Sequence, residues 1–175
     1  GGGSVIDSAK GIGYGLANPG DVWDYYAKKK EITACAPLGA VLTIAAAGSE
    51  MSWASVMTNE DGWFKLGYQN DVLRPVFTIM NPELTYTLPP YQTACGVVDM
   101  IMHILERFFS PHAEDDLTDE IAAAIIRNVI KNGEIVKRTP CDYNARFQIM
   151  WAGSLAHNGI LEGGNGKGDW GAHHI

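Results

Sequence analysis

The fold of this chain is decided by the stretch Gly96-Val97-Val98-Asp99-Met100-Ile101-Met102-His103-Ile104-Leu105-Glu106. It is an apolar run with helical spacing, and it carries a carboxylate and an imidazole four residues apart. Positions i and i+4 lie on one face of an α-helix, so Asp99 and His103 can converge on one point and hold a metal ion. A polar pair on a mostly buried helix is the alternative, because two ligands do not complete a metal site.

Candidates for a third ligand are the other histidines, namely His112, His157, His173 and His174. His112 follows Ser-Pro in a turn and is expected to be exposed. His157 lies near the end of a predicted helix and can cap it. The spacing of the sequence does not choose between His157 and His173.

Outward from this stretch, the sequence pattern changes near Leu88, after which all predicted elements are helices. The predicted elements are a helix at 5–14, a short helix at 21–26, buried strands at 37–44 and 75–80, a strand at 55–58, and helices at 89–109, 117–132 and 143–159. Ser4 is the expected N-cap of the first helix, with Asp7 in its first turn. The pattern predicts two domains, an α/β part at 1–88 and an all-α part at 89–175.

The first residues, Gly1-Gly2-Gly3-Ser4, form a glycine-rich loop directly before a predicted helix. Glycines allow a backbone to approach a pyrophosphate closely, and a helix N-terminus offers amide donors and a positive dipole end. The alternative is a flexible glycine-serine linker. The loop does not match the GxGxxG fingerprint.

Composition excludes several classes of function. The chain has 175 residues, a net charge of -7 and no Lys/Arg stripe, so a nucleic-acid partner is not expected. It has no apolar run of about 18 residues, so no membrane span is expected either. The cysteines Cys35, Cys95 and Cys141 are widely spaced and odd in number, which predicts reduced thiols in a cytoplasmic protein.

The chain resembles the iron-containing (group III metal-dependent) alcohol dehydrogenase family, and within it the NAD(P)H-dependent butanol dehydrogenases and their aldehyde-reducing relatives. The segments that carry the resemblance are 1–10, 42–52, 80–89, 96–106 with its Asp-x3-His-x2-Glu pattern, 150–159 and 169–173.

The resemblance implies a dehydroquinate synthase-like two-domain architecture. Part of a dinucleotide-binding α/β domain is followed by part of a helical metal-binding domain. Members of the family extend beyond both ends of this sequence, so we expect an internal fragment that is inactive by itself. Relatives are often dimers, so a homodimer is also expected.

The resemblance also assigns site residues. Asp99, His103 and His173 match three of the family's four metal ligands, whereas His157 and His174 match none. The fourth ligand and the family's proton-relay histidine fall after residue 175, so no catalytic acid or base is assigned. The residues that match cofactor contacts are Gly2, Gly3, Ser4, Asp7, Thr43, Ser49, Ser52 and Lys65. Ala47 departs from the Thr of many relatives, which removes one hydroxyl contact.

The expected function is hydride transfer between NAD(P)(H) and a primary alcohol or aldehyde, such as butanol or butanal, with Fe²⁺ or Zn²⁺ as Lewis acid. One alternative is a glycerol/polyol dehydrogenase or sugar-phosphate enzyme of the same architecture. The other is an inactive nucleotide-binding fragment. The block at 81–84 and the turn at Asp169-Trp170 argue against the first alternative.

Overall fold

The structure is a computed structural model that describes residues 1–110, 116–163, 168 and 170–173. It contains two compact units. The α/β unit comprises Gly1–Leu42 and Ser49–Ile79, and the helical unit comprises Thr43–Gly48 and Met80–Ile175. The chain therefore contributes to the helical unit twice, first with a short loop and then with its second half.

The first helix of the α/β unit, α1, spans Gly3–Ala17. Ile6, Lys10 and Tyr14 are buried and recur every four residues, so they form the face that packs inward. The N-cap is Gly2, and the first turn contains no acidic residue. The prediction that Ser4 is the N-cap and Asp7 lies in the first turn is therefore wrong. Gly2 has an extended backbone, with φ −98° and ψ −169°, and the helix begins at the next residue, Gly3.

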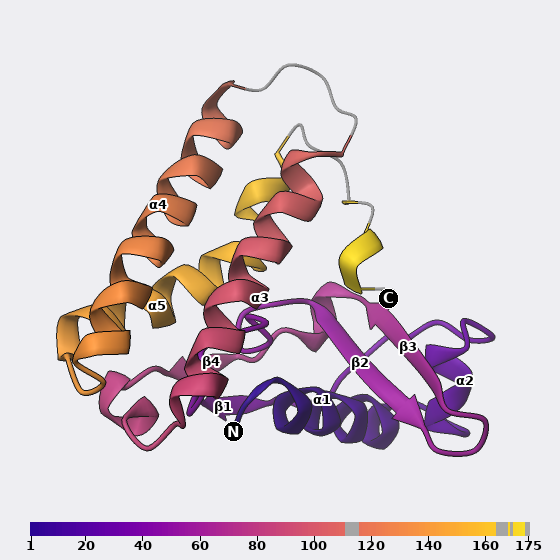
Figure 1. Ribbon diagram of the computed structural model, residues 1–175. Helices are drawn as coiled ribbons and strands as arrows, with labels where there is room; N and C mark the ends of the chain where they lie inside the picture. Colours follow the sequence, from indigo (N-terminus) through magenta and orange to yellow (C-terminus); the bar gives the residue numbers. More distant parts are fainter. Residues whose placement is uncertain (111–115, 164–167, 169, 174–175) are drawn as a thin grey trace. The chain divides into compact units, whose positions relative to one another are not determined.

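The predicted short helix is confirmed as α2, Val22–Tyr26, capped by the Asp21 carboxylate at 2.8 Å from the Trp23 amide. Strand β2 (Ala54–Asn59) confirms the predicted strand and pairs antiparallel with β3 (Phe64–Gln69), which the sequence analysis missed. The hairpin packs along α1 (Figure 1). The 3-10 turn η1, Asp71–Leu73, follows it. The core of this unit is largely aromatic and consists of Tyr14, Tyr25, Tyr26, Ile32 and Leu73.

The two predicted buried strands form a parallel pair, but they are shorter and more exposed than predicted. Strand β1 is Gly39–Val41 and strand β4 is Phe77–Ile79, with Ala40 opposite Thr78. Only Ala40 is buried, and Val41, Phe77 and Ile79 are exposed. Continuous apolar character indicated burial on both faces, which the described part of the chain does not provide.

The helical unit begins with the 3-10 turn η2 (Pro82–Thr85), capped by Asn81. Helices α3 (Pro90–Phe108), α4 (Asp116–Arg138) and α5 (Tyr143–Ala156) pack against one another, and α3 runs beside α4 in Figure 1. Short 3-10 turns follow at Ile160–Glu162 (η3) and Gly171–His173 (η4). No helix among the described residues is long and apolar enough to cross a membrane.

All three helices were predicted, but α4 continues six residues past its predicted end at Asn132. The Asn132-Gly133 pair suggested a stop, since both residues favour helix ends. The shared core lies mainly on buried side chains of α3, α4 and α5, including Met100, Ile104, Val129 and Ile149. Because one face of α3 packs into this core, the orientation of the helix is fixed, and so is the direction of the side chains on its other face.

The loop Thr43–Gly48 belongs to the helical unit because glycines allow it to approach two helices closely. A Cβ atom at Gly96 of α3 would lie 2.2 Å from the Ala45 carbonyl oxygen. A Cβ atom at Gly48, whose φ is +67°, would lie 2.7 Å from the Gly153 carbonyl oxygen of α5. Such separations are shorter than any van der Waals contact, so glycine is required at both positions.

Candidate active site

Helix α3 and turn η4 bring together the three residues predicted as metal ligands. One potential ligand atom from each of Asp99, His103 and His173 lies within 4.8 Å of the other two. Nε2 of His103 is 3.8 Å from Oδ2 of Asp99, and Nε2 of His173 is 3.5 Å from Oδ1 of the same carboxylate. Donor atoms of a tetrahedral ion with bonds of about 2.1 Å are about 3.4 Å apart. The spacing therefore fits a metal ion of that size.

The chemistry of the donors also fits a divalent transition metal. Burial lowers the pKa of His103 to about 3, with contributions from His173 and Arg107, so its ring is neutral at neutral pH and keeps a lone pair. Its Nδ1 atom is buried without a hydrogen-bond partner among the described residues. Two imidazole nitrogens and one carboxylate oxygen suit Fe²⁺ and Zn²⁺ equally.

Glu106, one turn beyond His103, holds the third candidate ligand in place. Its Oε1 atom lies 3.1 Å from Nδ1 of His173. A carboxylate on one ring nitrogen fixes the orientation of the ring and leaves the other nitrogen for a metal. The sequence signal for this role was the x2-Glu spacing after His103, although no role was assigned to it.

His157, the alternative third ligand, lies beside the site but faces Arg107. The guanidinium Nη2 is 2.9 Å from Nδ1 of His157, and because arginine only donates, this nitrogen must accept. The ring centroid of His157 lies 4.4 Å from that of His103, with the two ring planes tilted by 47°. The fully buried Arg107 also donates to the His103 carbonyl at 2.8 Å and lies under the Trp170 ring. His157 therefore supports the candidate ligands from the side.

A hollow in the helical unit leads to the candidate ligands. It is mostly apolar, and one face is formed by successive turns of α3. The lining residues are Tyr91, Ala94, Cys95, Val98, Asp99, Met102 and His173. An aliphatic chain placed there would carry a polar end group beside Asp99 and His173.

The predicted cofactor residues at the start of the chain lie at the N-terminus of α1. Gly2 is the N-cap, and Gly3 and Ser4 are in the first turn, with no side-chain cap hydrogen bond and no acidic side chain. Unsatisfied amides at a helix N-terminus, without a competing carboxylate, are suited to the pyrophosphate of a dinucleotide.

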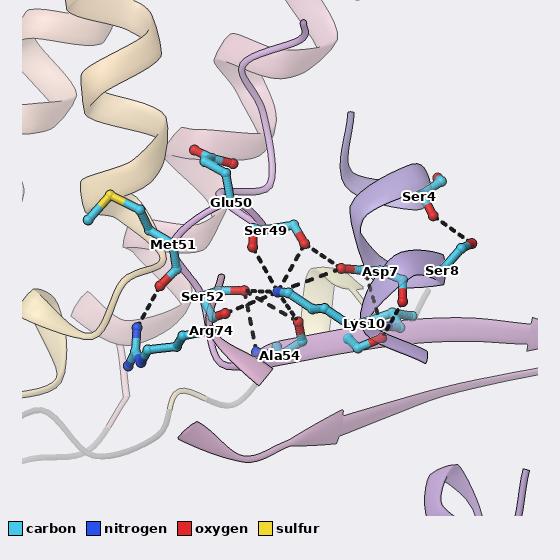
Figure 2. Close-up of polar contacts among 12 residues, drawn as sticks. Ser4, Asp7, Ser8, Lys10, Ser49, Glu50, Met51, Ser52, Ala54 and Arg74 are labelled. Atoms are coloured by element: carbon cyan, nitrogen blue, oxygen red, sulfur yellow. Dashed lines mark hydrogen bonds and ion pairs between the residues drawn. The ribbon is translucent and has the colours of Figure 1, made fainter. Parts of the chain in front are cut away.

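Asp7, Ser49 and Ser52 lie together in the α/β unit, around the amine of Lys10 (Figure 2). The Asp7 carboxylate accepts from the Ser49 hydroxyl and from the Val56 amide, the latter at 2.9 Å. Burial raises the pKa of Asp7 above its usual value, and these two hydrogen bonds oppose the rise. Asp7 and the two serines were predicted cofactor residues, whereas no role was predicted for Lys10.

The two remaining cofactor candidates, Thr43 and Lys65, are not part of this cluster. Thr43 begins the loop that belongs to the helical unit, and Lys65 is exposed on β3, opposite Thr58. His112, Asp169 and His174 lie outside the described residues.

Comparisons with known proteins cover almost the whole chain. A family model described as iron-containing alcohol dehydrogenase matches residues 1–82, and one for the C-terminal part of the Fe-containing alcohol dehydrogenase family matches residues 93–175. The chain is 41% identical over 173 residues to NADH-dependent butanol dehydrogenase A of Clostridium acetobutylicum, covering 99% of this chain and 44% of that protein. It is 34% identical over 176 residues to the NADPH-dependent aldehyde reductase YqhD of Escherichia coli, covering 99% and 45%.

A solved structure, NADH-dependent butanol dehydrogenase A from Thermotoga maritima, superposes with a TM-score of 0.94 at 40% identity. The superposition covers 97% of this chain and 42% of the Thermotoga maritima chain. The chain thus spans less than half the length of these relatives.

Proposed function

Because the chain belongs to the iron-containing alcohol dehydrogenase family, we propose that the complete protein is a metal-dependent oxidoreductase. It transfers a hydride between NAD(H) or NADP(H) and a primary alcohol or aldehyde, with butanol and butanal as the pair to test. The relatives named for NADH-dependent butanol oxidation and NADPH-dependent aldehyde reduction support this substrate class.

The observation that carries the proposal is the convergence of Asp99, His103 and His173 at the spacing of a metal centre. Asp99 supplies an anionic oxygen, His103 a neutral ring nitrogen, and Glu106 holds His173 with its second nitrogen toward Asp99. A divalent ion there, Fe²⁺ or Zn²⁺, would lower the pKa of a bound alcohol or polarise an aldehyde carbonyl.

The rest of the chain positions the two reactants. The apolar hollow along α3 receives the alkyl chain and directs its oxygen toward Asp99 and His173. Gly2, Gly3 and Ser4 bind the pyrophosphate of the cofactor through uncapped amides. The further cofactor residues are Asp7, Thr43, Ser49, Ser52 and Lys65.

The remaining proposals concern organisation. The predicted domains are a cofactor domain at 1–88 and a helical metal-binding domain at 89–175, whereas the compact helical unit already includes Thr43–Gly48 and residues from Met80 onward. We propose that the 175 residues alone lack turnover. The protein is cytoplasmic, since Cys35, Cys95 and Cys141 are all free thiols, and it forms a homodimer.

The test uses the complete protein and follows oxidation of NADH and NADPH with butanal, before and after chelation and after re-addition of Fe²⁺ or Zn²⁺. Turnover should require metal and should disappear in Asp99→Ala and His173→Ala, but not in Asp61→Ala, which removes an exposed carboxylate from the hairpin turn. Turnover unaffected by both ligand substitutions would reject the assignment. Cofactor binding without turnover on butanal would favour a polyol or sugar-phosphate substrate.

A further inference from the structure

The amine of Lys10 is fully buried and lies at the centre of a cage of oxygen atoms. Its Nζ atom is 2.7 Å from the Ser49 carbonyl, 2.7 Å from the Ala54 carbonyl and 3.0 Å from the Ser52 carbonyl. An ammonium group has three N–H donors, so these three carbonyls match its full capacity. The hydroxyls of Ser49 and Ser52 are slightly more distant, at 3.1 and 3.3 Å, and the Asp7 carboxylate is 4.0 Å away.

Donors from elsewhere in the α/β unit bind the carbonyls between these three. The Glu50 carbonyl accepts from the Thr78 hydroxyl at 2.8 Å, and the Met51 carbonyl accepts from Arg74 Nη1 at 2.6 Å. The Trp53 carbonyl accepts from the Asn70 amide at 2.9 Å. Every carbonyl of residues 49–54 therefore accepts a hydrogen bond from outside that segment. Lys10 supplies half of these bonds, and Figure 2 shows its three carbonyl acceptors.

The amides of the same segment are used differently. Residues 49–51 form a hydrogen-bonded turn that ends at Ser52, so the Ser52 amide has a partner within the loop. Among the described residues, the backbone N–H groups of Ser49 and Met51 have no well-formed hydrogen bond to protein. Backbone donors in a folded protein are normally satisfied by protein, water or ligand. A segment whose carbonyls all have protein donors, with amides left over, is suited to bind an acceptor such as a phosphate, ribose or carboxamide oxygen.

We propose that Lys10 is a positioning residue for the cofactor. It ties residues 49–54 to α1 through their carbonyls, and so presents the amides of this segment to the polar atoms of the dinucleotide. Lys10 lies two turns into the helix whose first amides are assigned to the pyrophosphate, so one helix sets both cofactor-binding segments. This inference rests on the proposed function, because it assumes that a dinucleotide binds the α/β unit.

The simpler interpretation is that Lys10 only stabilises the fold. The two interpretations differ in what its loss changes. A stabilising residue would alter the free energy of unfolding and leave the affinity of the folded protein for cofactor unchanged. A positioning residue would loosen residues 49–54 locally and weaken cofactor binding while the candidate metal site stays intact.

The test compares Lys10→Met, Lys10→Gln and Lys29→Met in the complete protein. Met has a similar length but no donor, Gln keeps part of the donors, and Lys29 is an exposed lysine of the same unit that pairs with Asp24. The measurements are the Kd for NADH and NADPH by fluorescence, KM for cofactor and kcat, bound metal, and hydrogen exchange of amides 49–54.

Lys10→Met should raise the cofactor Kd and KM by about tenfold or more, with kcat at saturating cofactor and metal content close to wild type. Lys10→Gln should show a smaller rise, and Lys29→Met none. Amides 49–54 should exchange faster in Lys10→Met even without cofactor. A folded Lys10→Met or Lys10→Gln with wild-type Kd and wild-type exchange in this segment would overturn the proposal.

A measurement on the wild-type protein applies even if both variants fail to fold. Bound NADH or NADPH should slow exchange of the Ser49 and Met51 amides by about tenfold or more. Unchanged exchange at these amides in the cofactor-bound protein would overturn the proposal. Absence of binding by either nucleotide would instead reject the proposed function, and exchange of the cofactor-free variants would still decide whether Lys10 holds the segment.

Discussion

Nδ1 of His173 lies 3.1 Å from Oε1 of Glu106, while Nε2 of the same ring lies 3.5 Å from Asp99. Glu106 thus sets the direction of a candidate ligand without being one. Glu106→Gln removes the negative charge at almost constant volume and should lower metal affinity by about 10- to 100-fold. Competition with a chelator measures it, and Glu134→Gln, an exposed change on α4, serves as the control. Wild-type affinity in Glu106→Gln would show that His173 orients itself without this carboxylate.

His157 should be dispensable for metal binding although its ring contacts that of His103. Its Nδ1 accepts from Arg107, so His157→Leu leaves a buried guanidinium short of one acceptor. We expect a loss of about 1–3 kcal/mol in the free energy of unfolding, seen as a lower Tm, with metal content unchanged. His103→Ala should lose the metal under the same conditions. An equal loss of metal in both variants would place His157 among the ligands.

Gly96→Ala and Gly133→Ala form a matched pair of glycine substitutions inside helices. A Cβ atom at Gly96 would lie 2.2 Å from the Ala45 carbonyl oxygen, whereas one at Gly133 would lie 3.4 Å from Val97 Cγ1. Gly96→Ala should therefore destabilise by about 1–3 kcal/mol through displacement of the Thr43–Gly48 loop. Gly133→Ala should stabilise by up to about 1 kcal/mol, since alanine favours a helix interior. Chemical denaturation distinguishes the two, and equal effects would contradict the close approach of this loop to α3.

Lys10 should also give the protein a distinctive pH dependence. Burial lowers its pKa to about 8, with Asp7, Glu50 and Cys35 opposing and Arg74 adding to the effect. An unfolded lysine titrates near about 10.4, so between the two values the unfolded chain binds more protons and this group raises the free energy of unfolding with increasing pH. Below pH 8 the cost of burying the charge is fully present.

Lysine side-chain NMR over this pH range tests the shift directly. One resonance should titrate near pH 8 and be missing from Lys10→Gln, while the rise in unfolding free energy through this window should be smaller in that variant. A set of lysine resonances that all titrate near their usual pKa would refute the expected shift.

The sequence predicted the helical half of the fold well because its signals are local. The apolar spacing around Asp99 and His103 placed α3 within one residue at each end, at Pro90–Phe108. The i, i+4 rule alone brought these two side chains together. His173, by contrast, comes from a turn far along the chain, and only the family resemblance selected it over His157.

One missed feature had a local signal. Strand β3 alternates apolar Phe64, Leu66 and Tyr68 with Lys65, Gly67 and Gln69, which is the pattern of a half-buried strand, so it was detectable from the sequence. The other missed features depend on tertiary contacts. Helix α4 continues past Asn132 because Ile135 and Val136 pack into the core of the helical unit, a tertiary contact that the local stop signal at Asn132-Gly133 does not reveal. Lys10 was detectable in principle, since a charged residue stands on the apolar stripe of Ile6 and Tyr14. Its acceptors, however, are backbone carbonyls about forty residues away in the sequence. Every residue type has such a carbonyl, so the sequence does not reveal which ones Lys10 contacts.

The contribution of Thr43–Gly48 to the helical unit has a consequence for cooperativity of folding. The loop covers Gly96 of α3 and approaches Gly153 of α5, while its neighbours on both sides belong to the α/β unit. A fragment that contains only residues 89–175 would lack this loop. Its two glycines, Gly96 and Gly153, and the helix surfaces around them would therefore be exposed. We expect the two halves to melt together, and a protease that cuts within residues 43–48 to loosen the helices that carry the candidate metal ligands.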